Sequence, residues 1–153
     1  METILSIIAL VISVISGGFA LYTFIWTARR DRKQATLDAY NMLQNEAFDK
    51  INLYRQAEIL EISKHPTSKE YNEIGAMIAR IEHFCVGVKK NIYDKKTVYE
   101  LAHGYFDGSK LKSRVTPIID RKNNNTDLDY YSNIHYVLDW MDRETKKRMG
   151  KKL

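Results

Sequence analysis

The sequence predicts an all-α protein in which one N-terminal transmembrane helix continues into a small cytoplasmic helical bundle. Residues 4–26 contain no charged side chain, and the 153-residue chain has only 7 Gly and 2 Pro, so long stretches lack a helix breaker. Further along, apolar residues recur at helical spacing, and no segment with a period of two is long enough to predict a sheet. We therefore expect residues 1–28 to form the transmembrane helix and residues 29–153 to form one helical domain.

The charge-free run is long enough to cross a membrane. Its 23 residues would span roughly 34 Å as a helix, more than the ~30 Å of a bilayer's hydrocarbon core. Tyr22 and Trp26 lie near its C-terminal end, where amphipathic rings favour the headgroup boundary. The cations that follow are Arg29, Arg30, Arg32 and Lys33. By the positive-inside rule, they predict a single-pass protein of the inner (plasma) membrane with its N-terminus outside and its C-terminal domain in the cytoplasm.

Two other interpretations of this run are weaker. A secretory signal peptide carries positive charge before a shorter apolar run and a small-residue cleavage site after it. Here the run is longer, the charge lies on its far side, and no convincing cleavage site follows. A buried core helix rarely stays uncharged for so long. The transmembrane interpretation is therefore preferred.

Small residues gather on one face of the predicted transmembrane helix. They are Ser6, Ala9, Ser13, Ser16, Gly17 and Ala20. Because lipid provides no hydrophobic drive between helices, close backbone approach along small residues is a main route to association. We therefore expect this face to form a homo-oligomer interface. A ring of copies whose serines line a pore is an alternative, and a helix that packs against nothing in particular is another.

The cytoplasmic part begins with a continuation of the first helix and a second, central helix. No Pro or Gly occurs between Trp26 and Pro66, so the first helix is expected to end near residues 63–65. Its apolar stripe is Leu37, Tyr40, Leu43 or Gln44, Ala47, Ile51 and Tyr54. Thr67 and Glu70 match a capping box that would start the central helix. The predicted inner face of that helix is Ile74, Met77, Ile78, Ile81, Phe84, Cys85, Val88 and Ile92.

Three further elements are expected in the C-terminal third. Asp94 is a candidate N-cap for a helix with Val98, Leu101, Ala102, Tyr105 and Phe106 on its apolar face. Thr116 and Pro117 predict an N-cap followed by Pro at the first helical position of a short turn. Thr126 and Asp129 resemble the start of the last helix. Its predicted inner face is Leu128, Tyr131, Ile134, Leu138 and Met141.

The sequence carries no recognisable catalytic or cofactor motif. It has no H-x-x-x-H, C-x-x-C, G-x-x-x-x-G-K-[ST] or G-x-G-x-x-G pattern. Glu82 and His83 are adjacent, so on a helix they point about 100° apart and do not converge on a metal. Cys85 lies on the apolar stripe and is expected to be a buried, inert thiol. We therefore expect no enzymatic activity, no metal and no cofactor.

The chain is basic, with 24 Lys+Arg against 19 Asp+Glu and a formal charge of +5. Such an excess suits an anionic lipid surface or nucleic acid, and composition does not choose between them. Membrane topology fully explains the cluster at residues 29–33. A second cluster consists of Lys146, Lys147, Arg148, Lys151 and Lys152. It could contact an anionic partner, return to the membrane, bind RNA or be a soluble tail, and no aromatic interleaves with it for base stacking.

Two segments resemble a known family. Residues 29–38 read RRDRKQATLD, and residues 81–94 read IEHFCVGVKKNIYD. They resemble the DUF4760 family, whose members look like bacterial and phage single-pass proteins. Such members have a transmembrane helix, a basic R/K-x-x-T-hydrophobic-D segment, and a helix ending in a G-(I/V)-K-x-x-(I/V)-Y-D-like signature. The resemblance implies the layout expected above and brings no enzymatic activity.

A second resemblance is architectural. Small membrane accessory proteins of RNA-targeting CRISPR systems also join one N-terminal helix to a helical cytoplasmic domain, and they form multimeric pores related to HEPN domains. The HEPN catalytic pattern is an Arg, four to six residues, then a His. The histidines here are His65, His83, His103 and His135, and none has an Arg at that spacing. The resemblance therefore does not extend to a ribonuclease, and it leaves a pore as an open alternative.

These observations predict a non-enzymatic, membrane-anchored helical module that self-associates and mediates protein interaction at the cytoplasmic membrane face. Its expected partners are the lipid bilayer, further copies of itself and a cytoplasmic protein. The alternative is an oligomeric pore-forming or membrane-depolarising effector, such as an accessory protein in antiphage defence. A membrane-tethered nucleic-acid binder is the least favoured hypothesis.

Overall fold

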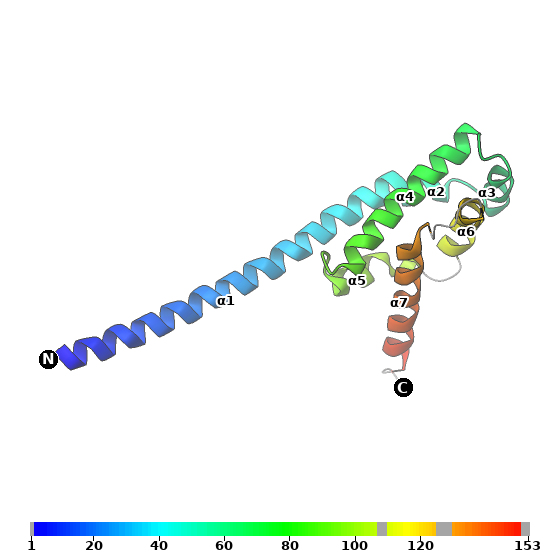
Figure 1. The fold of residues 1–153 in the computed structure, drawn as a ribbon. Helices are drawn as coiled ribbons and strands as arrows, with labels where there is room; N and C mark the ends of the chain where they lie inside the picture. The colour runs from blue at the N-terminus through cyan, green and yellow to red at the C-terminus, as the bar shows by residue number, and fades with distance from the viewer. Residues whose placement is uncertain (1, 107–109, 125–129, 151–153) are drawn as a thin grey trace.

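The fold is a long helix that projects from one end of a bundle of shorter helices (Figure 1). The computed structural model describes residues 2–106, 110–124 and 130–150, and every regular element within these ranges is helical. The elements are α1 (Glu2–Leu43), the π-helical turn η1 (Gln44–Phe48), α2 (Asp49–Asn52), α3 (Gln56–Ser63), α4 (Lys69–Lys89), α5 (Lys95–Phe106), α6 (Lys110–Asn123) and α7 (Ser132–Met149). The all-α prediction is confirmed.

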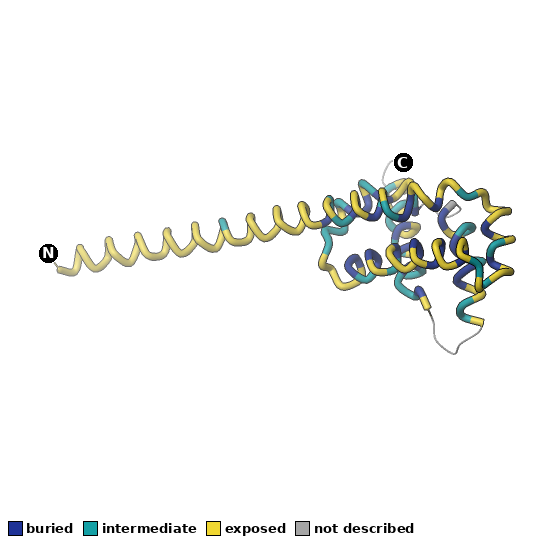
Figure 2. The backbone as a smooth tube through the Cα atoms, turned by 90° about the horizontal axis from the view of Figure 1, so that it is seen from above, coloured by how far each residue is buried: buried dark blue, intermediate teal, exposed yellow. Residues whose placement is uncertain are grey.

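The projecting part of α1 is the stretch that the sequence marks as apolar. Within the described ranges, one helix is long and apolar enough to cross a membrane, Glu2–Asn52, and none of its apolar window is buried inside the protein. Figure 2 shows α1 exposed over most of its length, and its first buried residue is Thr36. An exposed apolar surface of this length is typical of a membrane span and not of a core helix.

The central helix of the bundle is α4, as predicted. It packs against α1, η1, α2, α3, α6 and α7. The predicted inner-face residues from Ile74 to Val88 are all buried. Ile92, however, is 59% exposed, because α4 ends at Lys89 and Ile92 belongs to the turn that follows.

The capping-box prediction for α4 was wrong by one residue. The N-cap is Ser68, whose hydroxyl accepts a hydrogen bond from the Tyr71 N–H at 3.1 Å. Thr67 lies outside the helix, so Glu70 does not occupy the third helical position that a capping box requires. A single hydroxyl-to-amide bond therefore starts the helix.

The first helix is continuous from the projecting segment into the bundle, but it ends earlier than predicted. It stops at Asn52, and Arg55 is extended with φ −74 and ψ 153. The Glu58 carboxylate accepts the Arg55 N–H at 2.7 Å, which starts α3 as a separate helix. α3 then packs against α6. This local cap separates α3 from the first helix. The sequence prediction missed the break because no Pro or Gly marks it.

The π-helical turn η1 adds a large aromatic to the core. Ala47 and Phe48 are adjacent, both lie in this turn and both are 0% exposed. The Phe48 ring stacks on Tyr105 with centroids 4.7 Å apart and meets Phe106 edge-on at 5.5 Å. The helical stripe predicted from sequence contained Ala47 and missed Phe48, although two adjacent apolar residues can share one buried face, as Met77 and Ile78 do on α4.

The last two helices also differ from the sequence prediction. Pro117 lies inside α6 and does not begin a helix; the burial of Val115, Ile118 and Ile119 keeps the chain helical through it. For α7, Ile134 and Met141 are buried as predicted. The start predicted at Thr126 and Asp129, together with Leu128, lies outside the described residues. The described helix begins at Ser132, after Tyr131 in a left-handed conformation with φ 68.

Candidate functional site

The two segments that carry the sequence signature meet where α1 enters the bundle. Thr36 of α1 is 0% exposed. Its hydroxyl donates to the Arg32 carbonyl at 2.7 Å and accepts the N–H of Asp94, from the α4–α5 turn, at 2.9 Å. The Arg32 guanidinium donates to the Asn91 carbonyl in the same turn. Side chains of the basic segment (residues 29–38) therefore hold the end of the GVKKNIYD segment (residues 87–94) against α1.

The GVKKNIYD segment is a helix end with a specific geometry. Asn91 has φ 57, the left-handed conformation that commonly terminates helices. The Asn91 N–H bonds to the Val88 carbonyl at 3.2 Å, and the Ile92 N–H bonds to the Gly87 carbonyl at 2.9 Å. This pair of bonds is a Schellman motif, which satisfies carbonyls that would otherwise be unpaired at the end of α4.

Gly87 makes room for an aromatic ring. A Cβ on Gly87 would lie 2.7 Å from the Tyr93 Cδ2 atom and closer still to its Cε2 atom. The Tyr93 ring instead packs directly over the glycine and stacks on Phe84, with centroids 5.1 Å apart and planes 22° apart. The glycine and the tyrosine of the signature are therefore one packing unit.

Asp94 closes the turn by capping α5, as predicted. Its Oδ1 accepts the Thr97 N–H at 2.9 Å and the Thr97 hydroxyl at 2.7 Å. Partial burial favours the neutral acid, yet the bonds from Thr97 and the charges of Lys33 and Arg32 outweigh it and hold the pKa of Asp94 below its ordinary value. Because the pKa is lower in the folded protein, this cap stabilises the fold above about pH 4 and is lost as pH falls through the depressed pKa.

Both signature segments, residues 29–38 and 81–94, lie within the region that matches a protein-family model. The family model for a domain of unknown function, DUF4760, matches residues 10–139. The chain belongs to the DUF4760 family. Comparisons with curated proteins and with solved structures find no match. The match covers most of α1 and the bundle together, so the DUF4760 domain includes the apolar helix as well as the helices that follow it.

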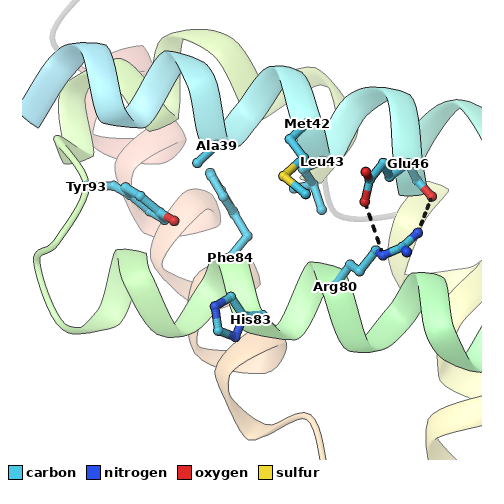
Figure 3. A pocket seen from close by; sticks show the side chains of 8 residues that line it. All are labelled: Ala39, Met42, Leu43, Glu46, Arg80, His83, Phe84 and Tyr93. Carbon is cyan, nitrogen blue, oxygen red and sulfur yellow. Dashed lines mark hydrogen bonds and ion pairs between the residues drawn. The ribbon is translucent and has the colours of Figure 1, made fainter.

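Beside the signature, the DUF4760 chain has an apolar groove between α1 and α4 (Figure 3). It encloses about 170 Å³ and is lined by Ala39, Met42, Leu43, Glu46, Arg80, His83, Phe84 and Tyr93. The Phe84 and Tyr93 rings lie at one end (Figure 3). At the other end, the Arg80 Nε forms an ion pair with the Glu46 Oε2 at 3.2 Å. Met42 is 61% exposed, so the groove offers an accessible apolar surface with a charged rim.

The residues predicted to anchor and orient a membrane helix lie on α1, from its projecting part to the point where it meets the bundle. Tyr22 and Trp26 are exposed. The Arg30 guanidinium lies over the Trp26 ring, 5.4 Å from its centroid, and forms an ion pair with Asp31 at 3.4 Å. Arg29 is exposed, whereas Arg32 and Lys33 act on the α4–α5 turn. Two of the four predicted orienting cations therefore also contribute to the tertiary structure.

The predicted oligomer-interface residues are all exposed and lie outside the bundle. They are Ser6, Ser13, Ser16, Gly17 and Ala20. A Cβ added at Gly17 would meet no atom of the described chain within 4 Å. The face is therefore sterically open to another helix.

The C-terminal cluster is divided by the fold. Lys146 pairs with Asp142 at 2.7 Å, and Arg148 pairs with Glu144 at 3.0 Å. The Arg148 guanidinium also lies 3.9 Å from the centroid of the Tyr99 ring. Lys147 is exposed, and Lys151 and Lys152 lie outside the described residues. Arg148 therefore joins α7 to α5 and is not a free cation for an anionic partner.

Buried titratable groups in the bundle are structural. Cys85 is buried, and burial, with a smaller contribution from the charge of Glu82, raises the pKa of its thiol well above the ordinary value. Burial, then the neighbouring Tyr105 and Asp49, raises the pKa of Tyr40 to about 12. Both groups are therefore neutral at physiological pH. In the described ranges, no three His, Cys, Asp or Glu side chains converge as metal ligands.

The Thr36 contact is open to a direct test. We expect Thr36→Val to destabilise the bundle by about 1–2 kcal/mol, because a methyl group cannot accept the Asp94 N–H and a buried donor is left unpaired. The measurement is thermal unfolding of the detergent-solubilised protein by circular dichroism. Thr116→Val is the matched control, because the Thr116 hydroxyl donates to the Lys112 carbonyl of its own helix at 2.6 Å. Equal losses of stability in both variants would mean that the hydrogen bond between Thr36 and Asp94 does not stabilise the bundle.

Proposed function

We propose that this protein is a non-enzymatic, membrane-anchored module that self-associates and binds a protein partner at the cytoplasmic face of the inner membrane. In this proposal α1 crosses the membrane with its N-terminus outside, and the bundle lies in the cytoplasm. The charge-free run followed by cations at residues 29–33 supports this orientation. The observation that carries the proposal is the continuity of α1 from the apolar segment into the core of the bundle.

A continuous helix would couple the bilayer to the bundle mechanically. Between Trp26 and Thr36 the helix has no Gly or Pro that could act as a hinge. Thr36 and Arg32 then tie the helix to the α4–α5 turn. Association or rotation of α1 in the membrane would therefore set the relative orientation of the cytoplasmic bundles, which is a way to present or hide a binding surface.

The groove between α1 and α4 is the best-supported surface for a protein partner. It combines the exposed side chain of Met42 with the rings of Phe84 and Tyr93 and the ion pair of Arg80 with Glu46. Apolar pockets rimmed by charge are typical of sites that receive a hydrophobic anchor residue from another protein. The unbranched Met42 side chain can adapt to different anchors.

A pore is the second candidate, and one observation favours it. Ser6, Ser13 and Ser16 lie on α1 away from the bundle, so the fold leaves them available to face a lumen. A ring of helices with these serines inward would conduct ions, whereas a dimer through the same face would not. The two candidates therefore differ in subunit number and conductance.

The proposal is tested by leucine substitutions on the small-residue face. We expect Ser13→Leu and Gly17→Leu to weaken self-association in nanodiscs about tenfold, on the scale of interhelical contacts worth ~1–2 kcal/mol. Val11→Leu, on the opposite face, is the matched control. Native mass spectrometry reports subunit number, and conductance of planar bilayers reports a pore. A wild-type protein that stays monomeric in membranes, or variants that associate as tightly as wild type, would contradict self-association through this face.

A further inference from the structure

The fold gathers a second group of cations beside the first. Two lysine pairs flank the α4–α5 turn: Lys89, Lys90, Lys95 and Lys96. Lys89, Lys90 and Lys96 are exposed, and Lys95 is partly exposed. The contacts of Arg32 with Asn91 and of Thr36 with Asp94 place this turn directly against α1. The lysines therefore lie next to the cations of residues 29–33.

The same turn is the part of the bundle nearest the projecting segment of α1. α4 runs back along α1, so its C-terminal end points toward the N-terminal half of α1, and Figures 1 and 2 both show this turn at that end of the bundle. Arg32 follows Trp26 by six residues, or about 9 Å along a helix. With Trp26 at the inner edge of the headgroup layer, which is roughly 5–8 Å thick, Arg32 would lie just outside that layer and the turn would face it.

Acidic groups neutralise only part of this charge. The basic end consists of Arg29, Arg30, Arg32, Lys33, Lys89, Lys90, Lys95 and Lys96. Asp31 pairs with Arg30, and Asp94 faces Arg32 and Lys33. Glu100 reaches Lys96 only at 3.9 Å. The remaining positive charge faces the membrane side of the bundle, where the leaflet surface is negative.

An apolar side chain lies at the tip of the same turn. Ile92 is 59% exposed, although its neighbour Tyr93 packs inward on Phe84. An exposed isoleucine flanked on both sides by lysine pairs has the composition of a peripheral membrane contact, in which the apolar residue enters the interface and the cations bind lipid phosphates. More than half of the surface of Ile92 is therefore accessible in the described bundle.

We propose that the α4–α5 turn (residues 89–96) is a second membrane contact that docks the bundle on anionic phospholipid. Ile92 enters the headgroup region, and the lysine pairs bind phosphate groups on either side of it. The docked bundle is then held at two points, α1 and the turn. This inference rests on the proposed crossing of the membrane by α1, because that crossing brings the turn to the bilayer surface.

The surface favours lipid over nucleic acid. Single-stranded nucleic acid is bound by cations together with aromatic rings on which bases stack. The aromatic of this turn, Tyr93, is committed to Phe84, and Tyr136 already lies beneath the ammonium groups of Lys89 and Lys95. The side chain that is left exposed at the tip, Ile92, is aliphatic. It therefore provides no ring on which a base could stack.

The test places a fluorophore on Ile92→Cys in the full-length protein in nanodiscs. Native Cys85 is 0% exposed, so labelling is directed to the new cysteine. Leu53→Cys is the matched control, because Leu53 is 81% exposed and lies about 30 Å further from the membrane along the same helix direction. Quenching by headgroup-labelled lipid is measured in phosphatidylcholine discs with and without phosphatidylglycerol.

The label at Ile92 is expected to be quenched in discs that contain phosphatidylglycerol, and the label at Leu53 is not. Each Lys→Gln change among Lys89, Lys90, Lys95 and Lys96 should lower the ratio of docked to free bundle roughly fivefold, and added salt should lower it further. Lys64→Gln, at the end of α3, and Lys69→Gln, at the start of α4, should leave it unchanged.

The outcomes separate this inference from the proposed function. A protein that is extracted from membranes by alkaline carbonate contradicts the membrane anchor itself. A protein that stays integrated while its Ile92 label is never quenched keeps the anchor and overturns the docking surface. Equal quenching without phosphatidylglycerol, or protection of the label only by added RNA or an acidic protein, also overturns it.

Discussion

Gly87→Ala is expected to destabilise the bundle by roughly 2–4 kcal/mol, even though alanine is the better helix former. The added methyl would penetrate the Tyr93 ring, which stacks on Phe84. Overpacking of this kind costs about 1–3 kcal/mol, and loss of an aromatic pair adds about 0.5–1.5 kcal/mol. Relief of the clash by moving Tyr93 would also disturb the turn that contacts Arg32. The measurement is denaturant or thermal unfolding of the solubilised protein.

Gly75→Ala is the matched control on the same helix. Gly75 is also buried, but a Cβ there would meet the flexible end of Lys122, with the Nζ at 3.5 Å. Helix propensity should therefore make Gly75→Ala neutral or stabilising by up to about 1 kcal/mol. In a Tyr93→Ala background, Gly87→Ala should no longer destabilise. A loss that persists in that background would show that the ring is not the cause.

Glu82→Ala is expected to destabilise the packing of α7 on α4 by roughly 2–3 kcal/mol. The Glu82 Oε2 accepts the Ile134 N–H at 2.9 Å, and its Oε1 accepts the Asn133 N–H at 3.2 Å and the Asn133 side-chain amide. A carboxylate at a helix N-terminus satisfies unpaired amides and complements the helix dipole. Bonds to charged acceptors are worth about 1.5–3 kcal/mol when one partner is removed.

Two variants distinguish this cap from a general loss of charge. Glu82→Gln keeps the acceptor oxygen without the charge and should lose about half as much. Glu73→Ala removes a carboxylate from α4 that pairs with exposed Lys69 at 3.7 Å, so it should change stability by less than about 0.5 kcal/mol. Limited proteolysis should cut the Glu82→Ala protein faster within α7. Identical stability of the alanine variants at both positions would rule out the cap.

The structural predictions that were confirmed depend on neighbours in sequence. Helical spacing placed Ile74 through Val88 on one face of α4, and Asp94 caps the residues that immediately follow it. The predictions that failed depend on contacts between distant segments or on alternative local bonds. Pro117 was expected to start a helix, yet burial of its neighbours keeps it inside one, and Phe48, which the predicted stripe left out, packs against Tyr105 and Phe106 in the core.

The candidate site shows the same division. The segments at residues 29–38 and 81–94 could be marked from sequence by their resemblance to the DUF4760 family. The contact between the two segments could not be predicted from sequence. Thr36 accepts the N–H of Asp94, and the two residues are 58 positions apart in the chain. Glu82 was weighed only with its neighbour His83 as a metal ligand, whereas its partners on α7 lie 51 and 52 positions away.

Hydrophobic periodicity and charge-free length are properties of consecutive residues, so they are enough to predict the helical class, the apolar segment at the N-terminus and the inner face of the central helix. Which helix ends meet depends instead on packing between helices. Packing of α4 back along α1 placed the turn at residues 89–96 beside the cations of residues 29–33, and it brought Glu82 to the start of α7. Such contacts follow from how helices bury their apolar faces against one another, which no single stretch of sequence contains.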